Sequence, residues 1–321
     1  MTQLTMAKAL NTGLRRAMEA DQKVMLMGED IGRLGGVFRI TDGLQKDFGE
    51  HRVVDSPLAE SAIVGAAVGL AMRGYRPVVE IQFDGFVYPA FDQIVSQVAK
   101  TFRRSEGLLR MPIVIRIPYG GGIGAVEHHS ESPEAYFAHT AGLRVLTPSD
   151  PGAAYRTIQQ AIACDDPVVY LEPKRRYWDR GEVDLSDVSG DPWRSRVLRP
   201  GTDVTIACYG PMVRCCLDAA EAADVSLEVI DLQSLSPLDL APVIASVERT
   251  GHLVVVHEAA RTGGVGAEVA AQITESCFYS LEAPVLRATG YDVPYPGSRL
   301  EEHYLPDLDR VLDAVDRSLA W

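Results

Sequence analysis

The stretch from Asp55 to Gln93 decides the fold: DSPLAESAIVGAAVGLAMRGYRPVVEIQFDGFVYPAFDQ. Its pattern predicts the end of a strand, a helix of small residues over Ser61–Arg73, a strand over Arg76–Phe83 and an aromatic loop. Residues three and four apart share one face of a helix, so Gly65 and Gly69 lie on the same stripe. Each glycine costs a helix about 1 kcal/mol relative to alanine, which indicates that another backbone approaches this stripe closely.

Glu60 stands at the start of this helix, directly after the apolar residues Leu58 and Ala59. A glutamate in a first helical turn is ordinarily a surface charge that the helix dipole stabilises. Here the flanking residues are apolar and the helix has no polar face to hold the side chain in water. Burial and the helix dipole act on the charged form in opposite directions, so the sequence leaves the ionisation of Glu60 open. It is the first functional candidate of the chain.

The composition is that of a globular protein with two domains. The chain has 321 residues, 46% of them hydrophobic, and this length exceeds one compact core. A net charge of −13 argues against nucleic acid and anionic membranes as partners. The N-terminus carries no signal- or transit-peptide pattern, so we expect a cytoplasmic protein. The cysteines form neither a CxxC pair nor a zinc spacing and are expected to be reduced thiols: Cys164, Cys208, Cys215, Cys216 and Cys277.

Strand and helix patterns alternate along the whole chain, which predicts an α/β fold with a doubly wound parallel sheet and helices on both faces. The predicted strands are 24–28, 51–55, 76–83, 112–117, 144–146, 167–171, 204–208, 227–231, 252–257 and 284–288. The predicted helices include 5–20, 41–48, 61–73, 90–104, 151–163, 213–223, 238–249, 266–276 and 307–319. We predict a first domain over 1–180, a linker over 181–200 and a second α/β domain over 201–321.

A glycine-rich loop, Tyr119–Ser130, ends in two adjacent histidines, His128 and His129. Imidazole titrates near neutral pH, so loop histidines beside glycines are candidates for proton transfer; two ordinary surface histidines are the alternative. The glycines could cradle a phosphate, but the GK[ST] element of a P-loop is absent. A mobile active-site loop fits the pattern better.

Two further segments have alternatives that the sequence leaves open. His257 and Glu258 precede the glycine turn Arg261–Gly266, which could bind an anion at a helix start, although a structural turn is favoured. Gln82, Phe83 and Phe86 follow a predicted parallel strand, and open α/β sheets bind ligands at that edge. Aromatic residues in such a segment can equally belong to the core.

Ordered motifs along nearly the whole chain resemble the β subunit of the thiamine-diphosphate-dependent decarboxylating component of 2-oxo acid dehydrogenase complexes. EIQFDGF, SPEAYF and EPKRRY are most similar to the branched-chain 2-oxo acid type. The resemblance implies a pyrimidine-type thiamine-diphosphate-binding domain followed by a transketolase C-terminal-like domain. The other motifs are GED, SPLAES, MPIVIRIP, GLRVLTPSD, DPVVYLEP, GTDVTIACYG, VIDLQSLSPLD, HEAARTGGVGAE and LEAPVLRATGYDVPYP.

The resemblance also assigns roles to residues of this chain. Glu60 matches the glutamate that hydrogen-bonds N1′ of the cofactor's aminopyrimidine. Leu58, Gln82 and Phe86 match positions that hold this ring. His129 matches the active-site histidine that handles substrate and helps acyl transfer to lipoamide. Glu60 and His129 are therefore the predicted catalytic residues.

The same resemblance implies two bound cations, K⁺ and Mg²⁺. The family has a K⁺ site built largely from backbone carbonyls, which would correspond to Ile113, Ala161, Cys164 and Asp166, with Cys164 where relatives carry an acidic residue. Mg²⁺ and the diphosphate are held by a GDG motif, which this sequence lacks and which belongs to the α subunit in this family. The resemblance therefore implies half of an active site, completed in an α2β2 heterotetramer.

The resemblance also implies partner proteins and a reaction. The stripe of Ala62, Gly65 and Gly69 would be a helix–helix contact with the α subunit. The second domain would mediate β–β pairing and docking to a lipoyl acyltransferase core. The implied reaction is decarboxylation of a 2-oxo acid, preferably branched-chain, with reductive acylation of a lipoyl domain. A pyruvate or acetoin enzyme of the same architecture is the near alternative. A non-catalytic assembly subunit is the other, and intact Glu60 and His129 argue against it.

Overall fold

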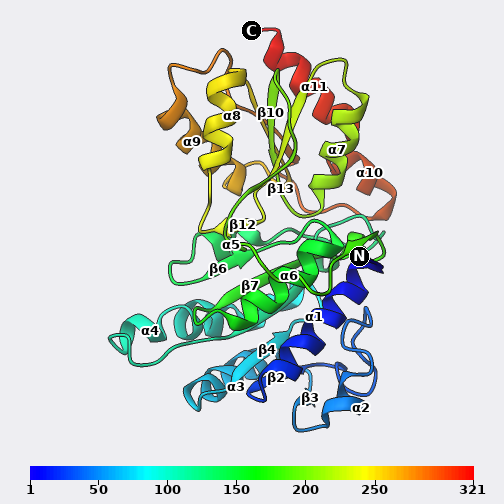
Figure 1. The fold of residues 1–321 in the computed structure, drawn as a ribbon, viewed down its shortest axis with the longest axis vertical. Helices are drawn as coiled ribbons and strands as arrows, with labels where there is room; N and C mark the ends of the chain where they lie inside the picture. The colour runs from blue at the N-terminus through cyan, green and yellow to red at the C-terminus, as the bar shows by residue number, and fades with distance from the viewer.

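Two sheets, one in each half of the chain, organise the computed structural model, which describes residues 1–321 (Figure 1). The first sheet has seven strands in the order β12-β6-β7-β5-β4-β2-β3, and every neighbouring pair is parallel except β12 with β6. Its parallel strands are β2 (Val24–Gly28), β3 (Val53–Asp55), β4 (Arg76–Glu80), β5 (Val114–Tyr119), β6 (Arg144–Leu146) and β7 (Val168–Pro173). These runs are mostly apolar because helices cover both faces of a parallel sheet.

The two faces of the first sheet carry different helices. The helices α1 (Met6–Ala20), α2 (Leu44–Phe48) and α6 (Pro151–Ala163) pack into one core cluster. On the other face lie α3 (Glu60–Met72), α5 (Glu134–Ala138) and the segment after β4. Thr5 caps α1 through its Oγ1, which accepts from the Lys8 N–H at 3.2 Å.

The second sheet has the order β14-β13-β10-β11-β9, with β9 as an antiparallel edge. Its strands are β9 (Arg196–Arg199), β10 (Val204–Cys208), β11 (Leu227–Asp231), β13 (Leu253–Ala260) and β14 (Leu286–Gly290). The helices α8 (Ala241–Thr250) and α9 (Val265–Cys277) cover one face, and α7 (Met212–Ala222) and α11 (Leu308–Leu319) cover the other (Figure 1). A short helix, α10 (Glu301–Tyr304), precedes α11.

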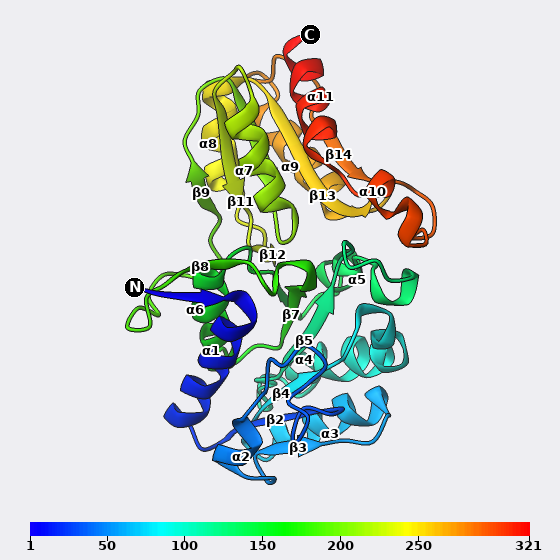
Figure 2. The same ribbon diagram turned by 90° about the vertical axis from the view of Figure 1, so that its right-hand side faces the viewer.

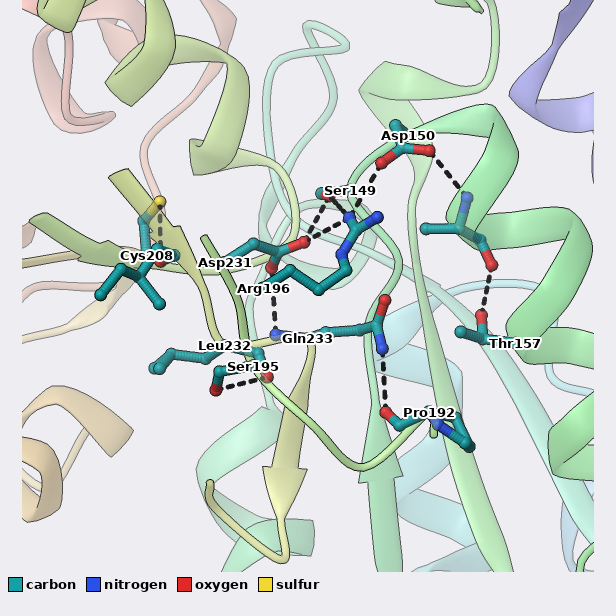
Figure 3. A network of polar contacts seen from close by, with 12 residues as sticks. Ser149, Asp150, Thr157, Pro192, Ser195, Arg196, Cys208, Asp231, Leu232 and Gln233 are labelled. Carbon is teal, nitrogen blue, oxygen red and sulfur yellow. Dashed lines mark hydrogen bonds and ion pairs between the residues drawn. The ribbon is translucent and has the colours of Figure 1, made fainter. Parts of the chain in front are cut away.

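The two halves are joined by more than the chain connection. Strand β12 (Ser234–Ser236) comes from the second half but lies at the boundary of the two halves (Figure 2), where it adds to the first sheet beside β6. Beside it, Arg196 Nη2 donates to Ser149 Oγ (2.9 Å), Asp150 Oδ2 (2.8 Å) and the buried Asp231 Oδ2 (2.7 Å) (Figure 3). These contacts fix the orientation of the second sheet on the first.

Most predicted elements are confirmed, including strands β2, β6, β10 and β11 at the predicted residues. The prediction of one helix over 90–104 is wrong: the chain forms a 3-10 helix over Asp84–Ala90, a π-helical turn over Gln93–Val98 and α4 (Thr101–Arg104). Within the predicted range, the Ala99 N–H donates to the Ile94 carbonyl at 3.0 Å, one residue beyond the α-helical partner, so the hydrogen bonding there is π-helical.

Short polar strands were not predicted. Strand β1 (Thr2–Thr5) pairs antiparallel with β8 (Arg180–Val183), so the stretch 181–200 contains part of β8 and all of β9. The domain limits themselves stay a prediction, whereas the predicted α/β class with a doubly wound parallel sheet is confirmed. No helix is both long enough and apolar enough to cross a membrane.

A buried ion cluster stabilises the centre of the first sheet. Arg116, on β5 and 1% exposed, donates to Glu80 Oε2 at 2.6 Å and to both carboxylate oxygens of Glu172 at 2.7 and 2.9 Å. The Tyr177 hydroxyl donates to Glu172 at 2.6 Å. Burial raises the pKa of the Glu80 carboxyl, while Arg116 opposes that rise.

Replacing Arg116 by methionine leaves two buried carboxylates without their cation, so we expect Arg116→Met to lower the free energy of unfolding by about 3–5 kcal/mol in denaturant titrations. The matched control is the triple change of Arg116 to Met with Glu80 and Glu172 to Leu, which removes all three charges and should recover most of the loss. A single variant as stable as the parent chain would show that the cluster contributes no net stability.

Candidate active site

The candidate site lies at the carboxyl edge of the first sheet. Glu29 directly follows β2, and Glu60 begins α3 after β3. The segment Gln82–Phe86 follows β4, and the loop that carries His129 follows β5. These four strands are consecutive neighbours in the sheet, so their carboxyl ends form one continuous edge. Ligands of open α/β sheets bind at this edge.

Glu60 is the first residue of α3 and is only 8% exposed. No side chain caps the start of this helix, and the Glu60 carboxylate has no hydrogen-bond partner within the chain. Leu58, two residues earlier, is 81% exposed. A largely covered carboxylate without a partner in the chain is suited to bind a donor from outside the chain.

Glu29 is a second carboxylate at this edge that the sequence did not single out. Burial raises the pKa of Glu29, and the charge of Glu60 raises it further. Its Oε1 is buried without a hydrogen-bond partner. The sequence feature that could have indicated Glu29 is its place immediately after a buried strand. Nothing in the sequence, however, shows that the ends of β2 and β3 bring Glu29 and Glu60 together.

An aromatic group surrounds His129. The ring centroid of His129 lies 4.0 Å from that of Phe83 and 5.1 Å from that of Phe86. Burial lowers the pKa of His129, and the neighbouring His128 and Lys174 lower it further, so the imidazole is neutral at neutral pH. Its Nδ1 is buried and has no hydrogen-bond partner. The structure thus brings two of the predicted site residues, Phe86 and His129, into contact.

Gln82 connects this group to the acidic pair. Its Nε2 donates to the backbone carbonyl of Glu29 at 3.3 Å, and the side chain is half-buried. Gly85 lies where a Cβ atom would come within 2.5 Å of the His128 carbonyl oxygen, so glycine lets the two segments pass closely. The segment after β4 and the loop after β5 therefore form one packed unit.

A buried ion pair, Asp84 with Lys174, contacts both the segment after β4 and the loop after β5. The sequence did not single out either residue. Lys174 Nζ donates to Asp84 Oδ1 at 2.6 Å, and both side chains are fully buried. Asp84 Oδ2 accepts the backbone N–H of Glu131 at 2.8 Å, two residues after His129. The Glu131 carbonyl in turn accepts the Gly120 N–H at 2.9 Å, which closes the base of the loop.

The residues predicted for K⁺ lie together at the opposite, amino edge of the first sheet. The Ile113 carbonyl accepts from Val168 N–H at 2.9 Å, and the Ala161 carbonyl accepts from Cys164 N–H at 3.2 Å. Cys164 O accepts from the Arg76 guanidinium at 3.0 Å. Each carbonyl keeps a second lone pair, but a positive side chain already binds there, so the residues fit a cation only in part. Asp166 bonds Arg144 at 2.8 Å.

The glycine turn after β13 has a structural role. A Cβ atom on Gly264 or Gly266 would lie 2.8 or 2.6 Å from the ring of the buried His257. Burial lowers the pKa of His257 to about 4, so this imidazole is neutral. The glycines make room for it, which supports the structural interpretation of the turn over an anion site.

Known proteins with the same two-domain fold are similar to this chain in sequence and structure. Residues 2–178 match the family model described as transketolase, pyrimidine binding domain, and residues 194–311 match transketolase, C-terminal domain. A solved structure, "Split gene transketolase, inactive beta4 tetramer", has the same fold with a TM-score of 0.80 and 24% identity over 99% of this chain and 98% of its own. The fold is therefore that of the pyrimidine-binding and C-terminal domains of the transketolase class.

Closer relatives define the family. The chain is 61% identical to pyruvate dehydrogenase E1 component subunit beta of Leifsonia xyli, over 99% of this chain and 95% of that protein. It is 57% identical to 3-methyl-2-oxobutanoate dehydrogenase subunit beta of Mycobacterium tuberculosis, over 98% and 92%. It is 44% identical to 2-oxoisovalerate dehydrogenase subunit beta of Pseudomonas aeruginosa, over 99% and 95%. The chain belongs to the family of E1 β subunits of 2-oxo acid dehydrogenases.

A buried carboxyl behind the loop predicts a pH effect. Glu134, the first residue of α5, is fully buried; burial raises its pKa to about 7, and the Tyr209 hydroxyl donates to its Oε1 at 2.8 Å. Between the unfolded-state pKa of about 4.3 and pH 7 the folded chain holds a proton that the unfolded chain has released.

This carboxyl therefore lowers stability progressively as the pH rises from about 4.5 to about 7, by about 3 kcal/mol in total. We expect Glu134→Gln, which keeps an acceptor for Tyr209, to flatten the fall of the melting temperature over this range. Glu302→Gln, at an exposed position, is the matched control. An equal pH slope in parent and Glu134→Gln chains would contradict the assignment.

Proposed function

We propose that this chain is the β half of a 2-oxo acid dehydrogenase that decarboxylates a 2-oxo acid with thiamine diphosphate and acylates a lipoyl group. The observation that carries the proposal is Glu60: nearly buried, at a helix start, without a partner, on the same edge as the His129 aromatic group. Catalysis would require an α subunit, which would supply Mg²⁺ and the diphosphate site because this chain has no GDG motif.

The residues at this edge fit an aminopyrimidine ring. Glu60 would hold a proton at ring atom N1′, for which a carboxylate lacking an internal partner is suited. Leu58 and Phe86 offer apolar and aromatic surface, and Gln82 offers an amide. Thiamine diphosphate, when bound, supplies the carbanion chemistry that decarboxylation needs. His129, neutral and half-buried, would exchange a proton with the substrate or with the acyl group on its way to the lipoyl domain.

Branched-chain 2-oxo acids are the proposed substrates. The relatives named for 3-methyl-2-oxobutanoate and 2-oxoisovalerate match over 92% or more of their length. The motifs EIQFDGF and EPKRRY support the same choice. Pyruvate is the alternative, favoured by the 61% identity to the subunit named for pyruvate dehydrogenase. The K⁺ site stays a prediction, and no step depends on it.

The exposed stripe on α3 supports an α-subunit contact. Gly69 is exposed, and a Cβ atom added there would meet no atom within 4 Å; at Gly65 it would meet only Gln93, at 3.6 Å. Packing within this chain therefore does not require either glycine, although each costs the helix about 1 kcal/mol. A partner helix lying across the stripe would explain both.

The experiment that tests the function uses this chain co-expressed with an α-type subunit. We expect the complex to bind thiamine diphosphate with Mg²⁺ in calorimetry and to turn over 3-methyl-2-oxobutanoate faster than pyruvate. The chain alone should bind the cofactor poorly. Glu60→Gln should assemble normally but lower turnover about 10²- to 10⁴-fold, whereas the exposed-site control Glu19→Gln should not. Full activity in Glu60→Gln would refute the role of this carboxylate.

Assembly is tested separately. We expect Gly69→Leu to fold as the parent chain does, because nothing in the chain lies against this position. The added side chain should prevent close approach of a partner helix and abolish co-purification with the α subunit, with Gly69→Ala intermediate. Ala222→Leu adds the same side chain at an exposed position of α7 and serves as the control. Normal tetramers of Gly69→Leu would exclude the stripe from the interface.

A further inference from the structure

Two carboxylates from the second half of the chain bind the loop that carries His129. Glu301, at the start of α10, accepts the backbone N–H groups of Gly122 and Gly124, each at 2.9 Å, one on each carboxylate oxygen. Glu258, on β13, accepts the N–H of Gly121 at 3.0 Å. Both carboxylates are buried, with 7% and 3% exposure. Three N–H donors of the loop, those of Gly121, Gly122 and Gly124, are thus satisfied by the other half of the molecule.

The glycines of the loop are required by these contacts. Gly122 and Gly124, whose N–H groups donate to Glu301, have φ of +87° and +72°, and Gly120 at the base of the loop has φ of +82°; glycine adopts this left-handed conformation at little cost. Gly121 is required for another reason: a Cβ atom there would lie 1.9 Å from the Tyr295 hydroxyl. That hydroxyl itself donates to Glu301 Oε1 at 2.7 Å.

Glu301 obtains its hydrogen bonds from the loop and from Tyr295. Its donors are two loop N–H groups and the Tyr295 hydroxyl, with no cationic side chain in contact. Burying a carboxylate is costly unless hydrogen bonds replace its water, so the loop in this shape stabilises Glu301, and Glu301 stabilises this shape of the loop. Glu258 differs because Arg175 also contacts it, at 3.3 Å.

His129 lies between the two anchored ends of this loop. Asp84 holds the base at Glu131, and Glu301 with Glu258 holds the glycine end. We propose that Glu301, assisted by Glu258, is a positioning residue through which the second half of the chain holds His129 against Phe83 and Phe86. The catalytic consequence rests on the proposed role of His129. The second half of the chain then contributes to the reaction at the carboxyl edge of the first sheet, in addition to its expected roles in subunit pairing and in docking to an acyltransferase core.

The test uses the co-expressed complex and the variant Glu301→Gln, which keeps the shape of the side chain but sets an amide NH₂ against a loop N–H. The control is Glu302→Gln, the exposed neighbour in the same helix. Amide hydrogen exchange over 120–131 should become at least about tenfold faster in Glu301→Gln only. Turnover at saturating substrate should fall about ten- to a hundredfold, with cofactor affinity and tetramer assembly unchanged.

The two measurements separate the possible failures. Unchanged exchange in the loop overturns the proposal, and so does faster exchange with unchanged turnover. An inactive parent complex refutes the proposed function instead, while the exchange result still decides whether Glu301 holds the loop. If Glu301→Gln does not assemble, Glu301→Asp, which keeps the charge but shortens the side chain by one methylene, should give the same loss of protection in milder form.

Discussion

Lys174 and Asp84 form an ion pair that water does not reach, and three segments of the candidate site meet at it. Asp84 follows the strand that delivers Gln82 and Phe83, Lys174 follows β7, and the second oxygen of Asp84 holds the loop beside His129. Burial raises the pKa of Asp84 and lowers that of Lys174, and each charge opposes the shift of the other. Either group alone would be an uncompensated buried charge, so the three segments keep their arrangement together.

Above this pair, polar groups at the edge of the sheet are left without partners. Glu29 Oε1 and His129 Nδ1 are buried and unpaired, and the Glu60 carboxylate has no partner within the chain. Buried polar groups are normally hydrogen-bonded, and the exceptions concentrate where a ligand completes the set. The same edge continues into α3, where Gly65 is half-buried and Gly69 exposed, and packing within the chain requires neither glycine. Both features support a site that is completed by a partner chain and a cofactor.

The sequence could predict what depends on local pattern. The strands of the first sheet are apolar runs, Thr5 caps α1, and Glu60 stands at a helix start whatever the distant chain does. Partners far apart in sequence were beyond this kind of inference: Asp84 and Lys174 are 90 positions apart, and Gly122 and Glu301 are 179 apart. Strands β1, β8 and β12 are short and largely polar, so no periodicity marks them, and they exist because another segment pairs with them.

The segment 90–104, which was predicted as one helix, shows that local pattern can also predict an element that the packed chain does not form. Its residues have helical spacing, but Gly142 approaches so closely that a Cβ atom there would lie 2.1 Å from the Ala99 carbonyl oxygen, and the backbone before Ala99 is π-helical. Local propensity yields when tertiary packing restrains both ends of a segment. The irregular path carries Asp84 and Phe86 toward the loop after β5, which is where the site needs them.

The relation between the two sheets explains why the second half contributes acidic groups. Glu258 lies near the carboxyl end of β13, and Glu301 follows β14, so the carboxyl edge of the second sheet faces the loop that leaves the carboxyl edge of the first. Loop N–H groups need acceptors, and carboxylates accept from several donors at once without adding a donor of their own. Neighbouring residues of a strand point to opposite sides, so β13 directs Glu258 to the loop while His257 stays in the core against Gly264 and Gly266. One strand thus serves the packing of its own sheet and the shape of a loop on the other.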